Sequence, residues 1–403
     1  MQVLAAALLQ KLGGHSITAK QLNDMLVQLG IDGRQRTRQE SSGLLLDSMA
    51  GMYTDGAASF FDFDGKESGL SLAPANPEWP WNRQTRAYSL SVWLQMERFA
   101  ARPVDAAVGE ASTSSTAAAA AAAAHPRLLS FLDDDGHGLE YFFRANRLVV
   151  RVLRSTSEIV DAEFPNKFQP GRWYHIAVVH KSGGTLARPG ISLFVDGAAQ
   201  PSAPQFSTVG ANGNSSPTLA PLYPQAHPQP TRCFIGTDGG ARRWGGAGHP
   251  MEPRALCGQM SSIYIFDDAL TAADIRGIFG LGPSYVHGFR PTDDLGSALE
   301  GGKFATEGAG LFDGHLTSSI WLSYNANACD GRQCFDTTPD VGKKADGMHA
   351  ALLGETVATG TQACVTRKFK DILAAMGGIK LLFPLFVQVP SQCLFCSLVA
   401  AFP

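Results

Sequence analysis

Residues 256–283 read LCGQMSSIYIFDDALTAADIRGIFGLGP, and this stretch decides the fold. Across Ser261–Phe266, isoleucines alternate with polar and aromatic side chains, a pattern that favours a β-strand. Thr271 is an N-cap residue with Asp274 three positions later, which predicts a helix. Three apolar residues at helical spacing support this helix: Ile275, Ile278 and Phe279. Gly280 is expected to end it. The stretch therefore predicts a strand followed by a capped helix.

The chain upstream of this stretch also has period-two segments. Asp-Gly and Ala-Asn pairs separate several of them, as turns do. The predicted strands are Ser59–Asp64, Tyr88–Met96, Arg127–Leu132, Leu139–Arg144, Arg147–Leu153, Glu158–Ala162, Arg172–Lys181, Ile191–Asp196, Arg232–Gly236 and Cys257–Phe266. The strand Arg172–Lys181 keeps no single apolar face, so we expect it in the centre of a sheet. Many short strands without helices between them predict a mainly β fold, an antiparallel β-sandwich.

The composition limits the class of protein. The 403 residues are enough for two or three domains, and 17% charged residues with 43 glycines and 23 prolines favours strands and turns over long charged helices. A formal net charge of −3 leaves no basic surplus, so no nucleic-acid partner is expected. Seven scattered cysteines do not make a disulfide framework, which favours a reducing, cytoplasmic setting.

Neither end of the chain predicts a membrane span or a leader. The start, MQVLAAALLQKLGG, has no basic segment before its apolar run, and we interpret it as a helix. The apolar run Ile379–Pro403 is interrupted by Pro384 and Pro390, whereas a spanning helix needs about 20 apolar residues.

Helices and insertions surround the predicted sandwich. Thr18 and Gln21 form a capping box at the start of an amphipathic helix within residues 1–50, which Gly30 ends. Residues 101–125 and 201–230 are low-complexity insertions, expected to be disordered surface loops. Helices are predicted again at Thr361–Met376 and Ile379–Val389.

Several motifs carry a resemblance to a known family. The segments lie in this order: YSLSVWLQ from residue 88, WYHIAVVH from 173, LFVDG from 193, RCFIGT from 232, and LCGQMSSIYIFDDALTAADI from 256. They resemble the concanavalin A-like domain of BEACH-domain proteins of the neurobeachin and Spirrig type. YNANACDGRQCFD from residue 324 and TQACVTRKFKDILAAMGGIKLLFPLF from 361 are similar to the region that follows that domain.

The resemblance implies a domain organisation and a function. It implies a concanavalin A-like sandwich at residues 55–285, a connecting segment at 286–360 and the start of an armadillo-like helical region at 361–389, with an atypical tail at 390–403. No BEACH module matches, so the chain is expected to be a fragment or a truncated gene product. The implied function is a non-catalytic scaffold in vesicle trafficking, membrane dynamics or autophagy, with trafficking proteins as partners and peripheral association with the cytosolic face of membranes.

Two other classes, a lectin and a laminarinase-like hydrolase, stay open as alternatives. A retaining hydrolase needs two carboxylates about 5–5.5 Å apart. Glu158, Asp161 and Glu163 are the nearest set, but Glu158 points to the opposite face of its strand from the other two. Trp79 and Trp81 in a loop could stack on a sugar, whereas Trp93 is expected in the core. We predict neither catalytic residues nor glycan binding.

The candidate metal ligands also have simpler interpretations. The run Asp133–Gly138 could bind Ca²⁺, but Asp-Gly between two strands is a hairpin turn. The cysteine pairs Cys329/Cys334 and Cys393/Cys396 could bind zinc. His349 and Cys364, which lie between the two pairs in the sequence, are further candidate ligands. Buried reduced thiols are the expectation, and no metal or cofactor is predicted. His175 and His180 are interpreted as core histidines and Asp267-Asp268 as a turn.

Overall fold

The computed structural model describes part of the chain in two compact units. The described residues are 9, 18–28, 48–49, 56–66, 68–72, 87–99, 125–133, 137–155, 158–181, 190–209, 232–237, 255–290, 310–330, 333–334, 337, 355–357, 360–366 and 369–382. One unit comprises residues 59–364, and the other comprises residues 1–58 with 365–403.

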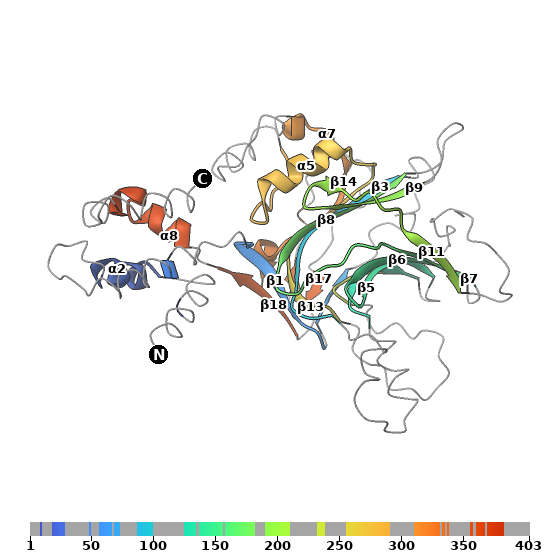
Figure 1. Ribbon diagram of the computed structural model, residues 1–403, viewed down its shortest axis with the longest axis horizontal. Coiled ribbons are helices and arrows are strands. Elements are labelled where there is room, and N and C mark those ends of the chain that lie inside the picture. The colour runs from blue at the N-terminus through green and yellow to red at the C-terminus, as the bar shows by residue number, and fades with distance from the viewer. Residues whose placement is uncertain are drawn as a thin grey trace, which may run out of the picture. The chain divides into compact units, whose positions relative to one another are not determined.

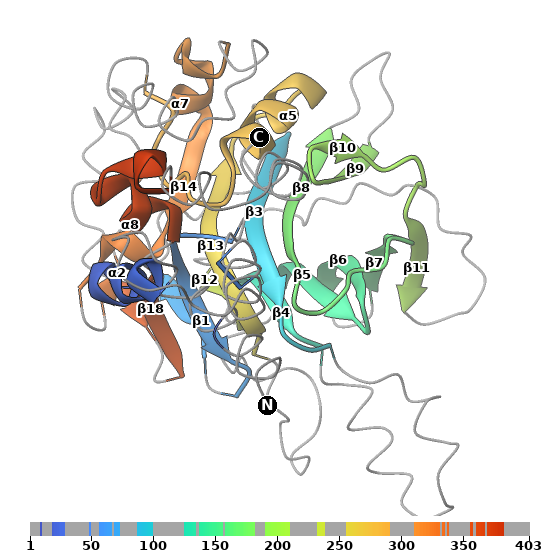
Figure 2. The ribbon, with the colours of Figure 1, turned by 60° about the vertical axis from the view of Figure 1, so that its left-hand side comes forward.

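The larger unit contains two antiparallel sheets, visible in Figures 1 and 2. In spatial order, sheet A consists of β10 (Ala198–Ala199), β9 (Gly190–Val195), β8 (Trp173–Lys181), β3 (Tyr88–Met96), β13 (Cys257–Phe266), β1 (Ser59–Asp64) and β18 (Thr361–Val365), and β14 (Ile320–Tyr324) also pairs with β13. Strand β8 is buried along most of its length, as a central strand should be.

Sheet B has ten strands. In spatial order these are β11 (Gln205–Val209), β7 (Glu158–Glu163), β6 (Arg147–Ser155), β5 (Gly138–Arg144), β4 (Arg127–Leu132), β12 (Arg232–Ile235), β2 (Leu70–Leu72), β17 (Glu355–Val357), β16 (Gln333–Cys334) and β15 (Cys329–Asp330). Strands β14 to β18 thus extend the two sheets with residues beyond 285, the predicted end of the sandwich.

Two strands share one edge of β13. Strand β1 pairs with its first half, where Phe61 lies opposite Met260. Strand β14 pairs with its second half, where Tyr324 lies opposite Ile263. The other edge of β13 pairs with β3. A strand from residues 59–64 and another from residues 320–324 therefore jointly complete this part of sheet A.

The main core lies between the two sheets. Alternate residues of each strand point inward, as the pleat requires. From sheet A these include Leu90, Val92, Ile176, Val178, Ile263 and Ile265, and from sheet B they include Leu139, Tyr141, Phe143, Val150, Val152 and Ala162. This arrangement confirms the predicted mainly β sandwich, and all ten predicted strands are present with small shifts at their ends.

Helix α5 (Ala272–Leu281) covers the outer face of sheet A (Figure 1). The predicted cap is confirmed: the backbone N–H of Asp274 donates to Oγ1 of Thr271 at 3.2 Å, and the N–H of Thr271 donates to the Asp274 carboxylate at 2.8 Å. The helix continues past the predicted end at Gly280 to Leu281, and Gly282 is its C-cap: Gly282 has a positive φ of 79°, whereas Gly280 does not, and the N–H of Gly282 donates to the backbone oxygen of Phe279. A second apolar cluster joins α5 to the sheet: Ala177, Val179, Phe194, Tyr264, Phe266, Ile275 and Ile278.

Two further expectations were wrong. Residues 361–365 form strand β18, so the predicted helix Thr361–Met376 begins at Phe369. Residues 205–209 form β11 within the stretch 201–230 that was expected to be disordered, because they find a partner in β7. The remaining residues of the two insertions, 101–124 and 210–230, lie outside the described part of the chain.

The smaller unit contains a helix pair. Helix α2 (Ala19–Gln28) begins after Thr18, whose Oγ1 accepts from the N–H of Gln21 at 3.2 Å, as the capping box predicts. Helix α8 (Phe369–Ala375) is followed by the 3₁₀ turn η5 (Gly378–Leu382). The apolar faces meet in one cluster: Leu22, Met25, Leu26, Met49, Phe369 and Leu373. The predicted end of α2 at Gly30 and the residues after 382 lie outside the described residues.

Candidate functional site

The outer face of sheet B carries a cluster of charges. We call it the arginine face, and it consists of Arg127, Glu140, Phe142, Arg144, Arg147, Arg151, Asp161 and Glu163, from strands β4 to β7. The strand register puts opposite charges side by side, because Glu140 lies opposite Arg151 and Arg151 lies opposite Asp161. Such cross-strand pairs of opposite charge stabilise a sheet.

Asp161 is the most constrained carboxylate of the arginine face. Arg151 donates to it from Nε at 2.7 Å and from Nη2 at 2.9 Å, a bidentate pair. Arg144 donates to the same carboxylate from Nη2. Burial acts to raise the pKa of Asp161, but the hydrogen bonds and charges of Arg151 and Arg144 outweigh burial and hold that pKa below its usual value. The carboxylate is therefore held ionised.

This environment bears on the hydrolase interpretation. Asp161 and Glu163 point to the same face, and Arg144 bridges them; Arg147 also contacts Glu163, at 3.2 Å. A glycoside hydrolase needs one carboxyl with a raised pKa to protonate the leaving group. The pKa of Asp161 is shifted in the opposite direction, which makes it a poor general acid. The side chain of Glu158 lies outside the described residues.

An aromatic ring lies at the centre of the arginine face. The guanidinium carbons of Arg127, Arg151 and Arg144 lie 4.6, 4.9 and 5.6 Å from the centroid of the Phe142 ring. These are cation–π distances. His125 stacks on the same ring at 5.2 Å. Burial and the neighbouring arginines lower the pKa of His125 to about 4, so its imidazole is neutral near pH 7.

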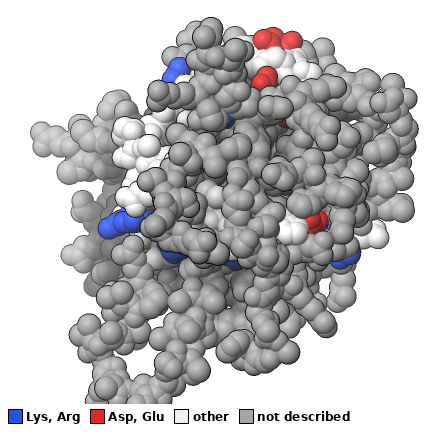
Figure 3. Space-filling model, turned by 90° about the vertical axis from the view of Figure 1, so that its right-hand side faces the viewer, with Lys and Arg blue, Asp and Glu red and all other residues white. Residues whose placement is uncertain are grey.

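Part of the arginine face is accessible to solvent. The side chains of Arg144, Arg147 and Glu163 are 33%, 23% and 19% exposed, whereas those of Asp161 and Glu140 are buried. Nε of Arg147 is buried and has no hydrogen-bond partner among the described residues. Figure 3 shows one face of the molecule, on which the charged atoms of the described residues form small separate groups of both signs.

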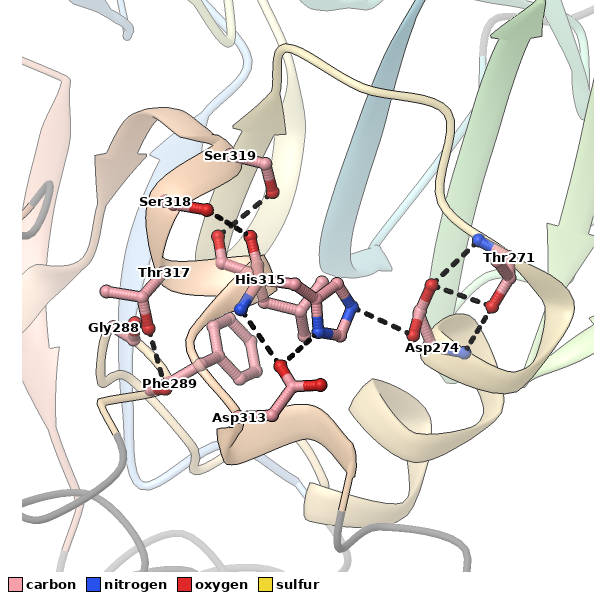
Figure 4. Close-up of polar contacts among 10 residues, drawn as sticks. Thr271, Asp274, Gly288, Phe289, Asp313, His315, Thr317, Ser318 and Ser319 are labelled. Carbon is pink, nitrogen blue, oxygen red and sulfur yellow. Dashed lines mark hydrogen bonds and ion pairs between the residues drawn. The ribbon is translucent and has the colours of Figure 1, made fainter.

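A second polar site joins helix α5 to the short helix α7 (His315–Ser319). Nε2 of His315 lies 3.2 Å from the Asp274 carboxylate at the start of α5, and its Nδ1 lies 2.5 Å from Asp313 (Figure 4). Partial burial lowers the pKa of His315, but the hydrogen bonds and charges of Asp313 and Asp274 outweigh burial and raise it. Thr317 then donates to the backbone oxygen of Phe289 at 2.7 Å, which fixes α7 against the preceding loop.

The two histidines proposed as core residues are buried on opposite faces of β8. His175 lies under α5, with its ring centroid 5.3 Å from Trp93 and 6.1 Å from Phe279. His180 lies between the sheets and contacts Tyr141 at 3.2 Å. Burial lowers the pKa of each histidine to about 3. Trp93 is also buried, whereas Trp79 and Trp81 lie outside the described residues.

The candidate metal ligands are distributed over separate parts of the fold. The carboxylate of Asp133 accepts from the backbone N–H of His137 at 2.8 Å, as in a turn that closes on itself. Cys329 and Cys334 pair in sheet B, whereas Cys364 lies in sheet A. His349, Cys393 and Cys396 lie outside the described residues. Within the described part of the chain, no group of three or more His, Cys, Asp or Glu side chains could hold a metal ion.

The arginine face was missed by sequence reasoning. Parity along β7 predicts that Asp161 and Glu163 share a face, but it does not show which cations face them. The sequence signal was the spacing of Arg147 and Arg151, an even separation that puts both side chains on one face of β6. Pairing β5, β6 and β7 in the observed register joins these two signals.

Two family models match separate segments of the chain. The family described as the concanavalin A-like lectin/glucanases superfamily matches residues 64–276, and the Neurobeachin/BDCP, DUF4704 alpha solenoid region matches residues 347–393. A solved pentraxin from Limulus polyphemus is 13% identical, with 57% of this chain and 84% of that chain covered and a TM-score of 0.32.

Two curated relatives cover most of the chain. A neurobeachin homologue from Caenorhabditis elegans is 29% identical over 83% of this chain, and BEACH domain-containing protein B from Arabidopsis thaliana is 26% identical over 94%. The chain spans 11% and 13% of their lengths. Among the described residues, no helix is long and apolar enough to cross a membrane. The chain belongs to the concanavalin A-like lectin/glucanases superfamily, and its homologues are neurobeachin and BEACH domain-containing proteins.

Proposed function

We propose that this chain is a non-catalytic interaction and scaffolding region of a BEACH-type protein. Its partners would be proteins of the trafficking machinery, met in the cytoplasm and on the cytosolic face of membranes during vesicle trafficking, membrane dynamics or autophagy. The observation that carries this proposal is the homology of the sandwich and of the following helical region to the same relatives.

The arginine face is the surface that we propose for partner contact. Arginine is enriched where interfaces gain most of their binding energy, because its planar guanidinium recognises carboxylates with two hydrogen bonds. Arg144 and Arg147 are the most exposed arginines of this face, and Arg151 is less exposed. The buried carboxylate of Asp161 pairs with Arg144 and Arg151. The chemistry fits an acidic segment of a partner protein. Glu163 between the two arginines would be displaced or bridged on binding.

A proximity-labelling experiment tests this function. The chain is fused to a biotin ligase in cells, and labelled proteins are compared between wild type, Arg147→Glu and the matched control Arg172→Glu. Arg172 is exposed and pairs with Asp196, and these two residues flank strands β8 and β9 of the other sheet. We expect enrichment of trafficking proteins that Arg147→Glu reduces and Arg172→Glu preserves. A labelling profile equal to that of the ligase alone would overturn the proposal.

Carbohydrate binding is the second candidate function, because the matched superfamily includes lectins. An array of glycans, probed with the chain with and without Ca²⁺, separates the two classes. Saturable, calcium-dependent binding would favour the lectin, and signals at background support the scaffold. An assay for hydrolysis of β-glucans tests the less favoured class, a hydrolase. Hydrolysis by the wild-type chain that is lost in Asp161→Ala and Glu163→Ala would favour the enzyme.

A further inference from the structure

Two cysteines face each other across the hairpin formed by β15 and β16. Cys329 lies directly opposite Cys334, and Asp330 lies opposite Gln333. Directly opposite residues in an antiparallel pair have Cα atoms about 4.5–5.5 Å apart. A disulfide needs about 4.4–6.8 Å between the same atoms. The backbone therefore holds this pair at a separation that a disulfide accepts without rearrangement.

The two sulfur atoms also converge on one point. Sγ of Cys329 lies 3.9 Å and Sγ of Cys334 lies 3.8 Å from the backbone oxygen of Asn325, so both thiols point toward the same acceptor. The structure holds both residues as thiols. Their side chains thus have the direction, as well as the separation, that bond formation requires.

The two thiols differ in access and in acidity. Cys334 is fully buried, whereas Cys329 is partly exposed. A hydrogen bond from Cys334 lowers the pKa of Cys329, and this effect outweighs the opposing effect of partial burial. A lower pKa puts more of Cys329 in the thiolate form, which is the nucleophile in thiol chemistry. Cys329 has the properties of an attacking thiol, and Cys334 those of a resolving thiol.

Other described cysteines have a different environment. Burial raises the pKa of Cys257 and of Cys364. Cys233 is buried in sheet B between residues of β2 and β4. No second pair of cysteines lies opposite each other in the ladders of the described strands. Within these ranges, a reactive dithiol is therefore confined to the β15–β16 hairpin.

We propose that Cys329 and Cys334 form a redox modification site that reacts with low-molecular-weight disulfides such as oxidised glutathione. The Cys329 thiolate attacks one sulfur of the disulfide, its S–S bond breaks, and one glutathione thiolate leaves and takes up a proton. The Cys334 thiol then loses its proton and attacks Sγ of Cys329, which expels the second glutathione. The two cysteines are oxidised by two electrons in total, and the glutathione disulfide is reduced to two thiols.

Peptide mapping of the whole chain tests the proposal. The chain is exposed to excess oxidised glutathione, remaining thiols are alkylated, and the protein is digested with trypsin. Because Arg332 lies between the two cysteines, cleavage there leaves two peptides joined only by the disulfide. We expect this linked pair as the dominant product. The Cys334→Ser variant should instead accumulate a glutathione adduct on Cys329, because the resolving thiol is missing.

Control variants separate this site from the other thiols. A Cys393→Ser/Cys396→Ser double variant removes the C-x₂-C pair near the C-terminus and should react at the wild-type rate. Cys329→Ser should slow modification of Cys334 by about tenfold or more, because Cys334 is buried. Equal modification of Cys364 and Cys329, or the absence of a Cys329–Cys334 link in wild type, would overturn the proposal.

Discussion

Nε2 of His175 on β8 lies 2.9 Å from Oγ of Ser91 on the neighbouring strand β3. The other ring nitrogen, Nδ1, is buried and has no hydrogen-bond partner among the described residues. One satisfied and one unsatisfied nitrogen suit a neutral imidazole, because a protonated ring would have to donate from both. The ring therefore resists protonation for as long as α5 covers it, and its environment is that of a structural residue.

This environment predicts an acid-sensitive fold. The pKa of His175 and of His180 is about 3 in the folded state, below the ordinary value of 6.5 that the unfolded chain has. Below pH 6.5 the unfolded chain therefore takes up protons that the folded chain does not. As the pH falls from 6 to 3, each histidine should therefore lower the free energy of unfolding by roughly 1.4 kcal/mol per pH unit. Urea unfolding at several pH values measures the slope.

The matched variant for this prediction is His175→Gln. Glutamine keeps a hydrogen-bonding side chain toward Ser91 but does not titrate. The slope of stability against pH below 6 should decrease by the contribution of one proton. An unchanged slope would mean that His175 is protonated in the folded state.

Replacing the central carboxylate of the arginine face should destabilise the larger unit. Asp161→Asn leaves Arg144 and Arg151 without their buried counter-charge. Removal of one partner from a buried ion pair costs about 3 kcal/mol. The free energy of unfolding in urea, measured at pH 7, gives the change. Glu163→Gln is the control, because that carboxylate is more exposed and should cost less; equal losses would contradict this ranking.

The cap of α5 should contribute measurably to stability. Thr271→Ala removes the side-chain oxygen that accepts from the N–H of Asp274. Loss of such a cap costs about 1 kcal/mol. Thermal unfolding of the larger unit should shift to lower temperature. Thr18→Ala removes the corresponding cap of α2 in the other unit and should leave that transition in place.

The pKa of His315 should lie above the ordinary histidine value. Hydrogen bonds and charges from Asp313 and Asp274 raise its pKa despite partial burial. Any stabilisation from the protonated ring is then fully present below pH 6.5 and is lost as the pH rises through the folded-state pKa. Nuclear magnetic resonance titration of the ring protons measures the pKa directly. In Asp274→Asn the pKa should fall, and a value that does not move would exclude the contact with α5 in solution.

The parts of the fold that could be predicted are those with local signals. Strands such as Tyr88–Met96 and Cys257–Phe266 are long and rich in β-branched and aromatic residues, so their own sequence defines them. Strand β17 (Glu355–Val357) has only three residues, and its partner β2 (Leu70–Leu72) lies far from it in the sequence. No local pattern can predict such a pairing, because the stabilising contacts come from the partner strand.

Strand β18 shows how a non-local contact overrides a local pattern. Val365 continues the helical spacing of Phe369, Ile372 and Leu373, and this spacing predicted one helix across all four. Residues 361–365 instead adopt the extended conformation of a strand, because they pair with β1. The arginine face has the same limitation: the face of Asp161 was predictable, whereas Arg144 and Arg151 reach it only through the register of three strands.

The shared edge of β13 has a consequence for synthesis of the protein on the ribosome. When β13 has left the exit tunnel, β1 can pair with its first half, but β14 begins more than fifty residues after β13 ends and has not yet emerged. The edge of β13 that pairs with β14 then presents unpaired backbone groups along its second half. The edge of β2 that pairs with β17 stays unpaired for even longer, because β17 is made later. Nascent chains from which residue 266 has emerged but residue 320 has not should therefore recruit chaperones, and binding should decline once residues 320–357 have emerged.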